Sequence, residues 1–251
     1  MKRKCHFVCK QSQDLYKNIL ADRIPLIMAL LIFNIGCLVG QDNEYGVWTS
    51  ITVEKKIKKW DLSSTAELRT IDYLNNINRF SVDIDGSYNI FKKLKVGAEA
   101  KFIYFHDFKY DDYQPRGRYA LYTQGKWKLC RFNFSLREKV ECTVKDVSDR
   151  IRSSGTIDTY RINPEWYWRN RLKVQYDIPT LPLAPGFSVE SFYQLNNPNG
   201  NVFDELRYTL SLQYRLSKKR SIEVFGLMAP ELNTSSPTTK YVGGVNYIIS
   251  F

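Results

Sequence analysis

Charged side chains of both signs recur at every second position along several segments of the sequence, and they are the residues best suited to chemistry. Opposite charges on one face of neighbouring strands can form ion pairs, and on a pore wall they can select small solutes. The set comprises Glu67, Arg69, Asp83, Asp85, Glu99, Lys101, Arg118, Arg137, Glu165, Arg169, Arg171, Glu190, Glu205, Arg207, Arg215 and Glu223. We expect an ion-pair network that fills an interior. A narrow polar pore for a small solute is the alternative.

Catalysis has one weak candidate, His106, which is the only histidine after residue 41. A hydrolase needs a nucleophile next to a base, most often Ser and His, and no recognisable serine motif accompanies this histidine. His106 continues the row of Phe102 and Tyr104, so an aromatic belt explains it better. We predict no catalytic residue, and a lipid-modifying hydrolase that uses His106 is the competing hypothesis.

The segment beside His106 is acidic, because Asp107, Asp111 and Asp112 follow it. Carboxylates of this kind can hold calcium, but Lys109 intervenes and a solvated loop is favoured. The sequence contains neither zinc-ligand spacing nor a phosphate-binding or dinucleotide motif. We therefore predict no metal and no cofactor. The formal net charge of +11 does not cluster into a basic stripe, so nucleic acid is not an expected partner.

The elements that carry these residues begin after an N-terminal export signal. The apolar run 24–40 follows a basic stretch and precedes polar residues, which is typical of a signal peptide cleaved before Gln41. At about 17 residues the run is near the lower limit for a spanning helix, so a helical anchor is the weaker reading. A lipoprotein signal at Cys37 is weaker still. We expect a signal peptide over 1–40 and one domain over 41–251.

After residue 44 the dominant pattern is alternation of apolar and polar residues with period two, which predicts strands. Between 79 and 90, for example, Phe80, Val82 and Ile84 alternate with Ser81 and Asp83. Eleven candidate strands follow, at 45–57, 60–72, 78–90, 94–106, 114–127, 129–143, 159–177, 187–194, 203–216, 220–229 and 240–251. Cys130 and Cys142 would share one strand about 40 Å apart, too far for a disulfide.

Connections alternate between tight turns, such as 58–59 and 126–128, and long polar loops, such as 144–158, which is the pattern of an outer-membrane barrel. A soluble lipocalin-like barrel or a sandwich would show the same alternation with its apolar face inside. Two features favour the membrane. Long charged side chains crowd the polar face, and aromatic residues gather at strand ends. These aromatics are Trp60, Tyr104, Trp127, Tyr160, Trp166, Trp168, Tyr241, Tyr247 and Phe251.

The last segment, 241–251, alternates and ends on Phe251, like the C-terminal strands that the barrel-assembly machinery recognises. We therefore predict an all-β, antiparallel, up-and-down transmembrane barrel in the cell outer membrane. Its expected partners are outer-membrane lipid and that machinery. Bacterial barrels normally have an even number of strands, so we expect 10 or 12. Either 45–57 is an extra segment, or a twelfth strand lies within 144–165.

The chain resembles a family of uncharacterised Bacteroidetes outer-membrane barrels classed as a domain of unknown function, DUF2490. The likeness rests on Trp48 and on the segments 66–70 (AELRT), 169–177 (RNRLKVQYD), 189–193 (VESFY) and 206–210 (LRYTL). A His-Arg pair that is usual in the family is Gly117-Arg118 here, so a role for that histidine does not transfer. The resemblance implies the fold and the outer-membrane location, and it implies no activity.

Overall fold

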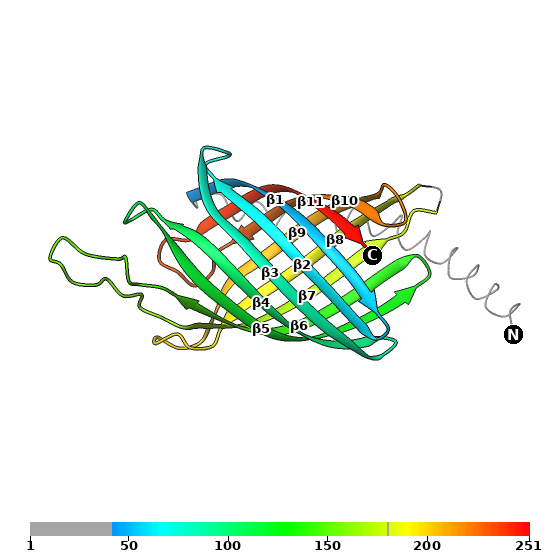
Figure 1. Ribbon diagram of the computed structural model, residues 1–251, viewed down its shortest axis with the longest axis horizontal. Helices are drawn as coiled ribbons and strands as arrows, with labels where there is room; N and C mark the ends of the chain where they lie inside the picture. The colour runs from blue at the N-terminus through cyan, green and yellow to red at the C-terminus, as the bar shows by residue number, and fades with distance from the viewer. Residues whose placement is uncertain (1–41, 180) are drawn as a thin grey trace, which may run out of the picture. The chain divides into compact units, whose positions relative to one another are not determined.

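The computed structural model describes residues 42–179 and 181–251, which form a closed β-barrel (Figure 1). Its strands are β1 (Asp42–Ile57), β2 (Trp60–Ile71), β3 (Asn76–Phe91), β4 (Leu94–Asp107), β5 (Asp112–Leu129), β6 (Phe132–Lys145), β7 (Glu165–Tyr176), β8 (Leu183–Gln194), β9 (Val202–Arg215), β10 (Arg220–Pro230) and β11 (Thr238–Ser250). The all-β barrel is confirmed. The expected signal peptide lies outside the described residues. Within those residues, no helix is long and apolar enough to cross a membrane.

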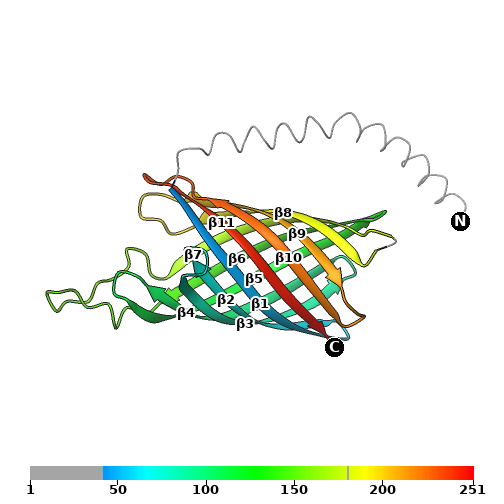
Figure 2. The ribbon, with the colours of Figure 1, turned by 90° about the horizontal axis from the view of Figure 1, so that it is seen from above.

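The expected count of 10 or 12 strands is wrong, because the described residues form eleven. Strand β1 is part of the wall, and the segment 146–164 adds no twelfth strand. Each strand pairs antiparallel with its sequence neighbour, and β1 closes the barrel by pairing parallel to β11 from Asp42↔Thr238 to Glu54↔Ser250 (Figure 2). An odd number of strands requires such a parallel seam, since the first and last strands then run in the same direction.

Several boundaries also differ from the prediction, and two of them have a clear physical reason. The turn placed at 126–128 is at Cys130 and Arg131, where Cys130 has φ 53°, so β5 continues through Trp127 to Leu129. The strand expected over 159–177 starts only at Glu165, because Pro164 lacks a backbone N–H and the residues before it are in bends. The cysteines therefore lie on a turn and on β6, and no disulfide joins Cys130 to Cys142.

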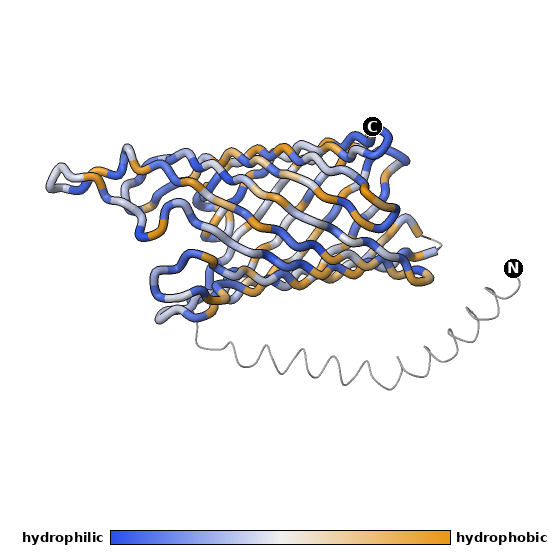
Figure 3. Tube along the Cα trace, turned by 90° about the horizontal axis from the view of Figure 1, so that it is seen from below, coloured by the Kyte–Doolittle hydropathy of each residue, from blue (hydrophilic) through white to orange (hydrophobic). Residues whose placement is uncertain are grey.

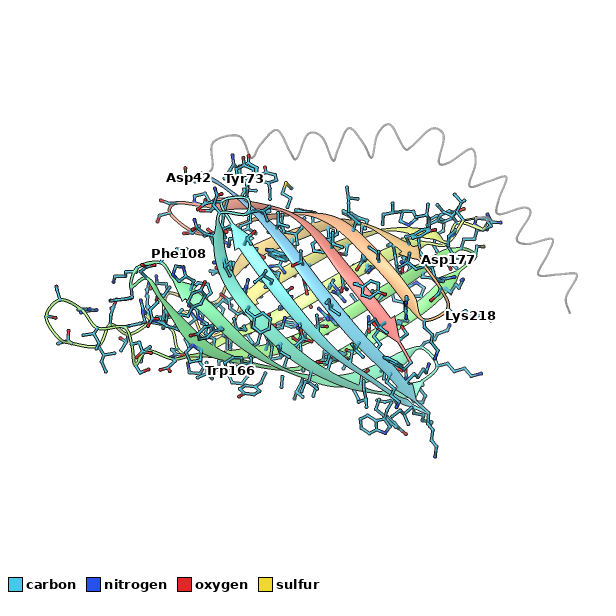
Figure 4. The ribbon with its side chains drawn as sticks, turned by 45° about the horizontal axis from the view of Figure 1, so that its top comes forward. Asp42, Tyr73, Phe108, Trp166, Asp177 and Lys218 are labelled. Atoms are coloured by element: carbon cyan, nitrogen blue, oxygen red, sulfur yellow. The ribbon has the colours of Figure 1, made fainter. Side chains whose placement is uncertain are left out.

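The two ends of the barrel differ in the length of their connections. One end, here the loop end, carries 108–111, 146–164, 195–201 and 231–237, together with the start of β1. The other, the turn end, carries the two-residue turns 58–59, 92–93 and 130–131, the connections after β7 and β9, and the end of β11. Figure 4 shows Asp42, Tyr73, Phe108 and Trp166 at the loop end and Asp177 and Lys218 at the turn end. The loop end is thus the end with the larger surface for contacts.

The outer wall of the barrel is apolar and the lumen is polar. Exposed side chains on the wall include Ile84 (65% exposed), Leu121 and Leu210, whereas Ser81, Gln114 and Glu141 on the inner face are buried. Figure 3 shows hydrophobic and hydrophilic residues alternating along the strands that face the viewer. A soluble barrel has an apolar interior and a polar exterior. This barrel has the inverse polarity, with an apolar exterior and a polar interior.

Aromatic side chains form contacts near both ends of the wall. At the turn end Trp60 packs against Tyr88 and Trp127 stacks on Phe134, with ring centroids 5.1 and 5.6 Å apart. At the loop end Tyr45 stacks between Tyr73 and Tyr241. One expected member does not belong to these belts: Tyr160 lies in a loop and donates a hydrogen bond inward to Gln114.

Candidate functional site: the charged lumen

The most ordered part of the lumen is near the loop end, where Arg69 on β2 contacts both an acid and an aromatic ring. Its guanidinium donates two hydrogen bonds to Glu67, at 2.8 and 3.0 Å. The same guanidinium lies over Trp48 on β1, with its central carbon 3.5 Å from the ring centroid. The charge is therefore satisfied on its edge by a carboxylate and on its face by an aromatic ring.

The arginine contacts continue across the lumen. Arg207 on β9 also lies near Trp48, at 5.6 Å, and its other neighbour is Phe192 on β8, at 4.6 Å. Arg169 on β7 lies 4.3 Å from the same Phe192 ring. Because β10 and β11 separate β9 from β1 in the wall, the contact between Trp48 and Arg207 spans two strands. We call the series Arg69, Trp48, Arg207, Phe192 and Arg169 the arginine–aromatic ladder.

Buried carboxylates extend the ladder into the opposite wall. Arg169 pairs with Glu141 at 2.7 Å and with Glu190 at 3.0 Å. Glu141 also lies 3.4 Å from Lys139, which pairs with Glu99 on β4 at 2.9 Å. These four residues on β6, β7 and β8 are at most 8% exposed, so their charges are held away from solvent and must neutralise one another.

A last set of contacts completes a ring around the inside of the barrel. On β4, next to Glu99 in the same inward row, Lys101 pairs with Asp83 at 3.1 Å. Lys101 also lies 3.7 Å from Glu67, which holds Arg69. The contacts therefore lead back to the start of the ladder, with one step, from Glu99 to Lys101, made by neighbours in the same inward row and not by an ion pair. We refer to this series of ion pairs, ring contacts and neighbouring charges as the lumen circuit.

Nearer the turn end the lumen contacts form pairs and short series, such as Gln175, Gln213 and Ser221. Tyr122 donates a 2.9 Å hydrogen bond to Asp85. Lys173 pairs with Glu223 at 3.2 Å. Gln175 and Gln213 join through a 2.9 Å amide hydrogen bond. This half of the lumen is polar but less connected than the loop-end half.

The charged residues singled out in the sequence occupy these contacts unevenly. Arg137 pairs with Glu190 at 3.2 Å, Arg118 lies 3.7 Å from Glu141, and Glu205 pairs with Arg207 at 2.6 Å. Arg171 and Arg215 form no ion pair with any described residue. Four important residues were missing from the predicted network: Trp48, Arg79, Lys139 and Glu141. The period-two pattern could have found them, because each lies in the inward row of its strand.

A second cluster joins the long loop 146–164 to the barrel rim. Arg150 lies 3.1 Å from Asp107 and 3.5 Å from Asp158, and Tyr160 donates hydrogen bonds to Asp107 and Gln114. Hydrogen bonds from Lys109, Tyr110 and Arg152 hold the pKa of the Asp158 carboxyl well below its ordinary value. The loop is therefore anchored to the rim through Asp158, which Lys109 and Tyr110 contact, and through the contacts of Arg150 and Tyr160 with Asp107.

His106 lies on the outer wall at the loop end. Its Nε2 lies 3.1 Å from an oxygen of Asp111, and its ring contacts Phe108 and Tyr113 at 4.4 and 4.7 Å. A base with an orienting carboxylate is half of a hydrolase site. Among the described residues, however, no serine or cysteine forms a hydrogen bond with His106.

The acidic residues after His106 point in different directions. Asp107 turns inward to Arg150, Asp111 contacts His106, and Asp112 accepts a hydrogen bond from the backbone of Tyr113. Over residues 42–179 and 181–251, no three His, Cys, Asp or Glu side chains converge as a metal site would require. The arrangement offers charge and hydrogen bonding, and its densest part is the lumen circuit.

The solved structures that are similar to this chain include a porin and an autotransporter domain. A structure titled as the NanC porin in a rhombohedral crystal form has 13% identity and a TM-score of 0.47, covering 74% of this chain and 85% of that chain. The β domain of the Bordetella autotransporter BrkA has 10% identity and a TM-score of 0.47, and the match covers 75% of this chain and 82% of that chain. None of the curated proteins matches the chain.

The comparison with protein families gives a match over most of the sequence. Residues 45–239 match the family described as protein of unknown function, DUF2490. The matched region begins in β1 and ends at the start of β11, so it covers most of β1 and all strands from β2 to β10. The chain therefore belongs to the DUF2490 family.

Proposed function

We propose that the chain is an integral outer-membrane protein whose lumen is closed by the lumen circuit, and that it acts as a scaffold or binding protein. The observation that carries the proposal is the inverted polarity of the barrel. Apolar residues such as Ile84, Leu121 and Leu210 cover the outside, while Lys139, Glu141 and Glu190 are buried inside. Lipid is the solvent in which such an exterior is stable. The barrel-assembly machinery and outer-membrane lipid are its proposed partners, after export by the N-terminal signal.

The circuit favours a closed lumen over a narrow pore. A pore needs a continuous polar path, whereas the ladder places the guanidinium of Arg207 between Trp48 on one side and Phe192 on the other. A barrel of this size leaves little space once large side chains cross it. Removing the central arginine should therefore open a path that the unchanged protein does not have.

Conductance in planar lipid bilayers tests the proposal. The purified unchanged protein should insert and give no steady conductance, and Arg207→Ala should give a measurable one. Arg215→Ala is the matched control, because it removes an inward arginine that is exposed at the turn end and belongs to no part of the circuit. Steady conductance from the unchanged protein would refute the closed lumen. Recovery of the protein in the soluble fraction without detergent would refute the membrane location.

A further inference from the structure

Arg79 on β3 is an arginine that the lumen circuit does not neutralise. In the β2–β3 register it directly opposes Arg69, and both side chains point into the lumen. Directly opposed residues on one face of a sheet have Cβ atoms about 4.5–5.5 Å apart, and like charges there destabilise the pair. Arg69 is neutralised by Glu67, at 2.8 Å. Arg79 forms no ion pair with any described residue, and its Nε is buried with no hydrogen-bond partner there.

Most of the charged groups that interact electrostatically with Arg79 are positive. They are three arginines, Arg69, Arg118 and Arg207, which repel it, and one carboxylate, Glu67, which attracts it. An arrangement with three cations around a fourth is unfavourable in a low-dielectric lumen unless negative charge is supplied.

The nearby carboxylates already pair with other cations. Glu67 is shared by Arg69 and Lys101. Glu141 is shared by Arg118, Lys139 and Arg169. Each of these acids therefore already interacts with more than one cation. The negative charge that would neutralise Arg79 is not supplied by the described residues.

We propose that Arg79, with Arg69, Arg118 and Arg207, binds a small oxyanion, either a carboxylate or a phosphate, in the loop-end half of the lumen. The planar guanidinium presents paired N–H donors whose spacing matches the oxygens of these groups. Arg79 is three residues from the start of β3 at Asn76, so the site lies near the loop-end mouth. The inference rests on the proposed membrane protein with a closed lumen, and it names the class of ligand that this lumen would take.

Binding is tested on the folded protein in detergent micelles, by titration with inorganic phosphate and, separately, with acetate. Sodium chloride keeps the ionic strength constant, so that screening is not mistaken for binding. The midpoint of thermal unfolding is the first readout, because a ligand of the folded state stabilises it. Tryptophan fluorescence is the second, since Trp48 lies against Arg69 at 3.5 Å.

At least one of the two anions should raise the unfolding temperature in a saturable way that chloride does not reproduce. Arg79→Gln should weaken its apparent affinity by about tenfold or more, because a charge-assisted contact is lost. Without added anion, Arg79→Gln should be at least as stable as the unchanged protein, since the repulsion from Arg69 is relieved. Arg215→Gln, the matched loss of an inward arginine at the turn end, should leave the affinity unchanged.

The proposal is wrong if neither anion acts beyond chloride, or if Arg79→Gln responds like the unchanged protein. It is also wrong if Arg79→Gln is less stable without anion, since Arg79 would then be a structural residue.

Should Arg79→Gln fail to fold, Arg79→Lys keeps the charge without the paired donors and should fold with weakened binding. Full binding by Arg79→Lys would refute recognition by the guanidinium. A barrel that inserts into bilayers but ignores both anions disproves this site alone. A response in a chain that is soluble without detergent disproves the membrane location alone.

Discussion

Tyr122 on β5 covers Gly97, its direct cross-strand partner on β4, inside the barrel. A Cβ atom at residue 97 would lie 2.4 Å from the tyrosine ring, so only glycine leaves space for the ring. The hydroxyl of Tyr122 donates a 2.9 Å hydrogen bond to Asp85 on β3. One ring therefore covers an exposed backbone and links three strands. Phe225 covers Gly244 across β10 and β11 in the same way.

Gly97→Ala should destabilise the barrel by about 1–3 kcal/mol, because the added methyl group displaces Tyr122 and its bond to Asp85. Urea-induced unfolding in lipid vesicles gives the measurement. Gly226→Ala is the control, since a Cβ there meets nothing within 4 Å. Equal midpoints for the two variants would contradict the role of the ring.

Glu190→Gln should destabilise the protein by about 3–5 kcal/mol, because it leaves the buried Arg169 and the half-buried Arg137 without their shared counter-charge. Glu223→Gln removes an acid that pairs with the more exposed Lys173 and should cost at most about 1 kcal/mol. The same urea experiment compares them. If both variants unfold at the same urea concentration, burial does not set the strength of these ion pairs.

Asp158→Asn should loosen the loop 146–164 and speed its hydrogen–deuterium exchange at neutral pH. The lowered pKa of Asp158 sets the pH dependence of this effect. A carboxyl whose pKa is lower in the folded state stabilises the fold fully above its unfolded pKa of 3.8, and less as pH falls below that value.

The exchange difference between Asp158→Asn and the unchanged protein should therefore be complete at pH 5 and above and shrink below about pH 4. Asp149→Asn, an exposed residue of the same loop, serves as the control and should match the unchanged protein throughout. A difference that stays constant down to pH 2 would show that the ionised carboxylate does not hold the loop.

The exposed Cys130 reports which end of the barrel faces the cell exterior, because it lies in the β5–β6 turn at the turn end. If short turns are periplasmic, a membrane-impermeant maleimide should label Cys130 only after the outer membrane is permeabilised. In a Cys130→Ser background, Ser153→Cys on the long loop should be labelled in intact cells. The reverse pattern would place the short turns outside the cell and the long loops in the periplasm.

Period-two alternation was sufficient to predict most of the strands. Phe80, Val82 and Ile84 line the outer face of β3 as expected, because successive side chains of any strand point to opposite faces. Strand ends were less predictable. Cys130 takes the left-handed turn conformation, and no feature of its residue type announces this.

The number of strands shows where local pattern stops being informative. The eleven segments were visible, but the even-number rule suggested that one was spurious or one hidden. Pairing of Asp42 with Thr238 and of Glu54 with Ser250 closes the barrel in parallel. That pairing joins residues nearly 200 positions apart, so no window along the chain could reveal it.

In the lumen, too, the sequence pattern predicts which side chains point inward but not which of them contact one another. Alternation identified inward charges such as Arg69, Arg169 and Glu190, because the face of a side chain depends only on its parity along the strand. Which charges meet depends on the stagger and tilt of strands around the closed barrel. These bring Trp48 on β1 to Arg207 on β9 and leave Arg79 opposite Arg69 without an acid. The alternation along each strand therefore determined which side chains face the lumen, and the closure of the barrel determined which of them contact one another.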